Sequence, residues 1–239
     1  RFFRLLGVAV IIWGLVYGSF FGFKLPFALI DTSTDVITIL IISVVIGFVT
    51  VMTGLFLSGK KNIRMKDYAA AYNSGFAWML ILIGLALLAA GRLFPTLAMV
   101  GFIGQWLAIV NAVGIVLVSI FSAKSLKGLG PALFNLYNIS SYVGDLVSFT
   151  RLMALGLAGA SIGSAFNLIV SLFPPFARFS IGIVLFLALH GINMFLSFLS
   201  GYVHGARLIF VEFFGKFYDG GGKAFKPLKP AEKYVRYKK

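Results

Sequence analysis

Long apolar stretches separated by short polar segments dominate the chain. A bilayer core of about 30 Å needs roughly 20 apolar helical residues to cross it, and six stretches are long enough. They lie at about 2–23, 36–57, 74–90, 101–121, 132–172 and 176–217. The second stretch is rich in Ile and Val, which also suits strands, but its length favours a helix. The pattern therefore predicts an all-α membrane protein with about six transmembrane helices.

The last two apolar runs are each about 40 residues long. At about 1.5 Å per residue they would form roughly 60 Å of helix, twice the thickness of the bilayer core. They must therefore tilt steeply, break or protrude. Pro174 and Pro175 lie between them and favour a turn. We expect a long, strongly tilted antiparallel helical hairpin.

Three regions follow from this pattern. We expect a four-helix membrane support region at 1–130, the tilted hairpin at 131–218 and a basic cytosolic tail at 219–239. The tail is rich in Gly, Pro and Lys, as extensions outside a membrane often are. The chain begins with Arg1 and nothing in it reads as a signal peptide. We therefore expect it to be the C-terminal part of a longer protein.

Composition supports a membrane location. Of all residues, 60% are hydrophobic and only 12% are charged, whereas soluble domains are about 25% charged. The net charge of +14 lies mostly in short loops and the tail, which indicates membrane topology and contact with anionic headgroups rather than nucleic-acid binding. Cysteine is absent, so disulfides and thiol chemistry are excluded.

The basic residues also predict the orientation. With six spans both chain ends lie on one side, which then holds 16 of the 21 Lys and Arg residues, while the other side holds three. By the positive-inside rule the C-terminus is cytoplasmic. The two remaining basic residues, Arg151 and Arg207, lie inside the last two apolar runs.

Arg151 lies near the middle of its run, where an arginine costs at least about 2.5 kcal/mol and normally faces protein or water. Its helical face is formed mostly of hydroxyls and small residues and comprises Ser141, Gly144, Ser148, Leu155 and Ala158. Asp145 points about 120° away on the same helix, so a local pair is not expected. Pairing with another acid of the chain and snorkelling to an interface remain alternatives. We favour a counterion on another chain.

Arg207 ends a polar stripe on the last run. Asn193, Ser197, Ser200, His204 and Arg207 are spaced 4, 3, 4 and 3 residues apart, which places them on one helical face. Such a stripe indicates a wetted path or a polar helix interface, and we favour the path, in which His204 could handle protons.

The two acids within the apolar runs have open roles. Glu212 either flanks an opening of the path or is a surface residue near the tail. Asp145 is either a half-channel acid or a satisfied helix-packing residue.

No pattern predicts catalysis on this chain. The three glycines before Lys223 lack the spacing and context of a phosphate loop, and there is no nucleophile elbow. His190 and His204 are fourteen residues apart without an obvious third ligand, so we expect no metal site and treat His190 as structural. We expect no cofactor either.

Two segments resemble the membrane domain of subunit a, also called subunit I, of the V-type and A-type rotary ATPases. One is 151–158 (RLMALGLA). The other is 207–218 (RLIFVEFFGKFY), followed by Asp219, three glycines, Lys223, Phe225 and Pro227. The second is more specific because its order and its place near the chain end both match. The earlier spans agree only in number and pattern.

The resemblance implies a stator subunit that forms half-channels for H⁺ or Na⁺ and takes no part in hydrolysis itself. Its implied partners are a rotor ring of proteolipid subunits, soluble ATPase and stalk subunits, and the lipid bilayer. Arg151 matches the family's essential arginine and Arg207 its second arginine, both presented to rotor carboxylates. The half-channel candidates are Asp145, Ser148, Asn193, Ser197, Ser200, His204 and Glu212.

Two other classes of function remain open from the residues alone. One is a stand-alone secondary transporter or channel in which the arginines bind an anionic substrate. The other is a membrane anchor in which the polar stripe only joins helices. A proteolipid ring that co-purifies with soluble ATPase subunits would favour the rotary class, and a lone substrate-binding chain would favour the transporter.

Overall fold

A computed structural model describes residues 2–24, 30–31, 34–123, 129–218, 220–222 and 225, so most of the predicted tail at 219–239 lies outside the described residues. Five helical stretches are long and apolar enough to cross a membrane, and a sixth apolar helix is shorter. The long ones are Val36–Arg64, Tyr68–Leu93, Ala98–Ser122, Leu133–Ser171 and Pro175–Lys216, and the short one is Arg4–Val16. The predicted all-α membrane fold with about six helices is confirmed.

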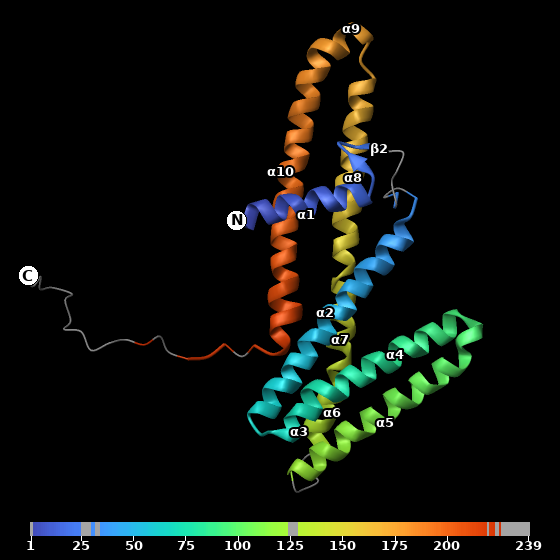
Figure 1. Ribbon diagram of the computed structural model, residues 1–239, viewed down its shortest axis with the longest axis vertical. Helices are drawn as coiled ribbons and strands as arrows, with labels where there is room; N and C mark the ends of the chain where they lie inside the picture. The colour runs from blue at the N-terminus through green and yellow to red at the C-terminus, as the bar shows by residue number, and fades with distance from the viewer. Residues whose placement is uncertain are drawn as a thin grey trace, which may run out of the picture.

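The first helix is shorter than its apolar run. α1 (Phe2–Val16) ends where Gly18 (φ 55°), Phe21 (φ 50°) and Gly22 (φ 77°) turn the backbone into the two-residue strands β1 (Ser19–Phe20) and β2 (Phe23–Lys24). Gly18 and Gly22 adopt their positive φ angles without steric cost, which explains why the helix stops before the apolar sequence does. At about 1.5 Å per residue α1 reaches only about 22 Å. It runs across the long hairpin rather than along it (Figure 1).

α2 (Val36–Arg64) is helical throughout, as its length predicted, and it continues past the apolar run to Arg64. Two long helices follow it, α4 (Ala77–Leu93) and α5 (Ala98–Ala123). The short helix α3 (Tyr68–Ala71) and the π-helix η1 (Tyr72–Phe76) precede α4, and the 3₁₀ turn η2 (Pro95–Leu97) lies between α4 and α5. α4 and α5 lie side by side (Figure 1). They approach closely because a Cβ on Gly84 would lie 2.7 Å from the carbonyl oxygen of Gly104.

The last two runs form the expected antiparallel hairpin (Figure 1). The first arm consists of α6 (Leu129–Tyr137), α7 (Ile139–Ser148) and α8 (Thr150–Ser171). Pro174 is extended (φ −56°, ψ 154°) and turns the chain into the second arm. That arm consists of α9 (Pro175–Ala177), the π-helix η4 (Arg178–Gly182), α10 (Ile183–Arg207), the π-helix η5 (Leu208–Phe213) and the 3₁₀ turn η6 (Phe214–Lys216). The apolar spans of the two arms, Leu133–Ser171 and Pro175–Lys216, have 39 and 42 residues and are about twice as long as a bilayer core is thick.

The buried core joins α2 and the α4–α5 pair to the hairpin near the break between α7 and α8. Its members are Val51, Leu55, Ala77, Trp78, Ile81, Leu82, Ile115, Phe149 and Leu208. Phe149 lies against Gly47 of α2, where a Cβ would approach its ring to 2.6 Å. This glycine therefore fixes where the hairpin packs on α2.

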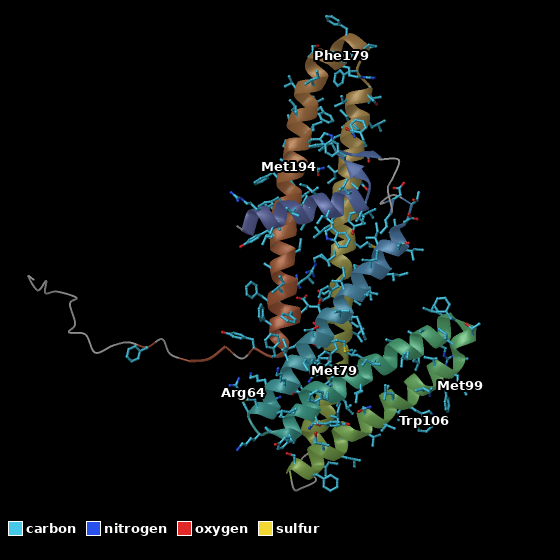
Figure 2. All side chains as sticks on the ribbon, in the orientation of Figure 1. Arg64, Met79, Met99, Trp106, Phe179 and Met194 are labelled. Atoms are coloured by element: carbon cyan, nitrogen blue, oxygen red, sulfur yellow. The ribbon has the colours of Figure 1, made fainter. Side chains whose placement is uncertain are left out.

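Apolar side chains also cover the outside of the described helices. Phe179 near the hairpin turn, Met194 on α10 and Trp106 on α5 are all exposed, and Figure 2 shows such side chains along every long helix. A soluble monomer rarely exposes apolar surface on this scale. This surface suits lipid, which is consistent with the length and hydropathy of the helices.

The end of the hairpin away from its turn is joined by an ion pair. Lys216 Nζ contacts Asp145 Oδ2 and also lies 4.3 Å from the ring centroid of Tyr142. The side chains of Lys216 and Asp145 are only 12% and 15% exposed, respectively. Lys61 of α2 donates a hydrogen bond to the carbonyl oxygen of Phe217 (3.0 Å). These contacts tie both arms and α2 together.

Gly47→Ala should destabilise the protein by roughly 1–3 kcal/mol, because the added methyl group overlaps the Phe149 ring and forces it to shift. Thermal unfolding of the detergent-purified protein measures the loss. Gly7→Ala is the matched control, since nothing lies within 4 Å of a Cβ at Gly7. Equal stability of the Gly47 variant and the wild type would contradict this account of the packing.

Lys216→Met should destabilise the protein by about 3–5 kcal/mol, because it leaves the Asp145 carboxylate buried without its partner. The double variant Asp145→Asn with Lys216→Met should recover most of that loss, since no unpaired charge remains. Both are compared by thermal unfolding. A double variant as unstable as the single one would show that packing of Lys216, rather than its charge, supports this end of the hairpin.

Candidate functional site

The helix tightens locally beside Arg151. The amide of Phe149 donates to the carbonyl oxygen of Leu146, and the amide of Leu152 donates to that of Phe149. Both bonds join residues three apart, as in a 3₁₀ turn, in which side chains three residues apart line up along the axis. The turn therefore brings Ser148 and Arg151 onto one line, and Arg151 Nη2 donates to Ser148 Oγ at 3.2 Å.

Ser148 connects this arm to the other. Its hydroxyl donates to Glu212 Oε1 at 2.7 Å, while its oxygen accepts from Arg151. Glu212 lies in the π-helix η5, which begins directly after Arg207, and it is only 2% exposed. The structure therefore does not support the alternative in which Glu212 is a surface residue.

The residues on both sides of Ser148 each have a buried polar atom without a partner in the described part of the chain. These atoms are Arg151 Nη1 and Glu212 Oε2. Arg151 is not neutralised by Asp145, whose carboxylate is paired with Lys216. Glu212 is linked to Arg151 only through the Ser148 hydroxyl, which lies between its carboxylate and the guanidinium. Arg151 thus keeps a buried N–H group that has no acceptor among the described residues.

A cavity of about 330 Å³ lies farther along the hairpin, among α8, α10 and the segment that follows α1. Small residues of α8, including Gly156, Gly159 and Gly163, make room for it. Asn193 and Ser197 of the predicted polar stripe line it, and Asn193 Nδ2 donates to the carbonyl oxygen of Gly159 at 3.3 Å. Part of the stripe therefore borders an open space next to α8.

The rest of the stripe leaves this cavity. Ser200 is half-buried and His204 Nδ1 is buried without a partner among the described residues. Arg207 is exposed at the end of α10. Its guanidinium makes no hydrogen bond or ion pair with any residue that the structure describes. The five residues share a helical face but lie in different surroundings. Asn193 and Ser197 line the cavity, Ser200 and His204 are half-buried, and Arg207 is exposed.

His190 also lines the cavity and was expected to be structural. It is buried, and its Nε2 lies 3.0 Å from Asn167 Oδ1. Asn167 in turn donates to the carbonyl oxygen of Phe21 at 2.8 Å, which attaches the turn after α1 to α8. The rings of Phe21, Phe166 and Phe186 surround the imidazole.

Sequence reasoning did not identify Lys216 or Asn167 as partners of site residues. Lys216 lies within the predicted hairpin, but no local pattern indicated that it would pair with Asp145, 71 residues earlier. Asn167 contacts a histidine 23 residues away and a backbone oxygen 146 residues away, so no local pattern could reveal it. The described residues contain no group of three or more His, Asp or Glu side chains placed to hold a metal ion.

A scan against protein-family models finds no match. The chain is similar to the A-type ATP synthase subunit I of Methanocaldococcus jannaschii, with 26% identity over 97% of the chain and 38% of that protein. It is 31% identical to the A-type ATP synthase subunit I of Pyrococcus horikoshii over 90% of the chain and 33% of that protein. The V-type ATP synthase subunit I of Chlamydia trachomatis is 32% identical over 54% of the chain and 18% of that protein.

These relatives share one subunit name across the A-type and V-type enzymes. The chain spans about a third of the length of the A-type relatives, and the matches to them cover nine tenths or more of its own residues. With the confirmed set of apolar helices, this similarity shows that the chain belongs to the subunit I (subunit a) family of the V/A-type ATPases.

Proposed function

We propose that this chain is the stator membrane subunit of a V/A-type rotary ATPase. It forms the half-channels for H⁺ or Na⁺ and presents Arg151 and Arg207 to carboxylates of a rotor ring. Hydrolysis or synthesis of ATP takes place on other subunits. The proposal is supported by the subunit I relatives and by the five helices that are long enough to span a membrane.

One observation carries the role of Arg151. Its guanidinium lies within a long apolar hairpin, Nη2 is held by a serine, and Nη1 is buried without an acceptor in the described chain. A charge at membrane depth is costly unless it is paired or wetted. A carboxylate supplied by the rotor is a partner of the right charge and can accept from the free N–H group.

The charge of Arg151 can drive release of the ion. A rotor carboxylate neutralised by its ion can face lipid, whereas a bare carboxylate there would be very costly. When the rotor brings the carboxylate to Arg151, the fixed positive charge favours the ionised acid and so lowers its affinity for the ion. The ion then leaves by the second half-channel, and the same positive charge repels a cation that would cross directly.

The order of residues along the first arm suits two separate half-channels. Asp145 and Ser148 precede Arg151, and the glycines that border the cavity follow it. We assign the cavity with Asn193 and Ser197 to one half-channel, which Ser200 and His204 extend along α10. The region of Asp145, Ser148 and Glu212 borders the other. Arg151 lies between the two regions and therefore separates them.

We also propose how the subunit lies in the membrane and which partners it contacts. The chain is embedded in the bilayer with its C-terminus in the cytoplasm, as the distribution of basic residues predicts. Its partners are a ring of membrane proteolipids and the soluble ATPase and stalk subunits of the same enzyme.

Arg151→Ala should abolish ATP-driven ion transport by the reconstituted complex while the complex still assembles. Arg151→Lys should fail too, because a compact ammonium lacks the planar fork of arginine and can lose its proton when buried. Transport is measured in proteoliposomes with a dye for H⁺ and with isotopic Na⁺, and assembly by gel filtration.

Arg92→Ala is the matched control, since Arg92 is an exposed arginine in the last turn of α4, outside the hairpin. It should transport at the wild-type rate. Normal pumping by Arg151→Ala would rule out the proposed role of this arginine.

A further inference from the structure

Ser148 differs from several other helical hydroxyls in the described chain. The hydroxyls of Thr50, Thr53, Thr150 and Ser171 each donate to a backbone carbonyl three or four residues earlier. This is the usual local choice for serine and threonine in a helix. Ser148 instead donates across the hairpin to Glu212 Oε1. An acceptor on the other arm therefore determines where its proton points.

The direction of that proton matters for Arg151. A hydroxyl has one proton to donate and lone pairs with which to accept. Because the proton is directed to Glu212, a lone pair of Ser148 is left to accept from Arg151 Nη2. If Glu212 did not accept, the hydroxyl could rotate back to its own helix, as Thr150 does, and its contact with the guanidinium would be lost.

The serine also keeps the acid at a distance. No ion pair within 4.0 Å joins Arg151 to Glu212 in the described chain, and Arg151 Nη1 stays without an acceptor. A direct, bidentate pair would occupy both guanidinium nitrogens and compete with any outside carboxylate. The interposed hydroxyl holds one nitrogen and leaves the other available.

We propose that Ser148 and Glu212 are positioning residues that hold the Arg151 guanidinium in the orientation in which it meets the rotor carboxylate. The inference rests on the proposed function. Ser148 holds the guanidinium, Glu212 holds Ser148, and the buried Phe149 ring against Gly47 fixes the turn that carries both Ser148 and Arg151. In this role Glu212 acts as a hydrogen-bond acceptor and does not itself carry the transported ion.

The test compares Ser148→Ala with Thr150→Ala in the assembled complex with its rotor ring. Thr150 is the matched control because its hydroxyl bonds only to the backbone of its own helix. Ser148→Ala should lower ATP-driven transport by about tenfold, the effect of one lost hydrogen bond to a charged group. It should also speed modification of the rotor carboxylate by a carbodiimide, which attacks the protonated acid. Thr150→Ala should change neither rate.

Glu212 is tested by a pair of variants. Glu212→Gln keeps an oxygen that accepts from Ser148, so transport should fall much less than in Glu212→Ala. Glu212→Ala removes the acceptor and should lower transport as much as Ser148→Ala, and combining the two alanines should add little. If Glu212→Gln were as defective as Glu212→Ala, the charge of Glu212 would be required and the positioning role would be wrong.

Carbodiimide labelling separates this inference from the proposed function. Arg151→Ala should speed carbodiimide labelling, because no fixed positive charge then favours the ionised rotor acid. Wild-type labelling in Ser148→Ala, together with faster labelling in Arg151→Ala, would contradict only the positioning role. Wild-type labelling in Arg151→Ala would instead remove the proposed function, and the positioning role with it. Slower transport by Ser148→Ala without faster labelling would indicate a merely structural effect and would also overturn the inference.

Discussion

The structure depends on one charge that makes no direct ion pair among the described residues, the guanidinium of Arg151 within an apolar helical hairpin. Such a charge costs at least about 2.5 kcal/mol at membrane depth, and it is held here by a single serine hydroxyl. The acids that could neutralise it are engaged elsewhere. Asp145 is paired with Lys216, and Glu212 contacts the other side of Ser148. The described chain thus gives this charge no direct counterion, as expected if an acid from another subunit completes the site.

Close packing of the hairpin on α2 holds the region around Arg151 in place. α2 presents Gly47 to the Phe149 ring and Gly54 to the stem of Lys216, so both arms of the hairpin rest closely on one helix. The core lies at this junction, while most other apolar side chains face outward. In lipid, helices associate through close packing and polar contacts rather than through the hydrophobic effect. Contacts at glycine therefore determine where the arginine is placed.

The hairpin is built differently on the two sides of Arg151. Before it, Tyr142, Asp145 and Ser148 form a dense network with residues of η5 and η6. After it, the glycines of α8 open a cavity beside Asn193 and Ser197. The π-helix η5 follows Arg207 and carries Glu212 back to Ser148. π-Helical turns shift the register of side chains and are frequent at functional sites, and here the shift brings an acid into the network.

The sequence by itself determined the number of apolar helices, the length of the two hairpin arms, the turn at Pro174 and the two arginines inside the hairpin, because these follow from local hydropathy, proline geometry and the cost of charge in lipid. It could not supply the partners of those residues. The pairing of Asp145 with Lys216, the contact of Ser148 with Glu212, and the link from Asn167 to His190 and Phe21 join residues between 23 and 146 positions apart. Only the tertiary structure decided them, because they depend on how two long helices and a crossing helix pack in space.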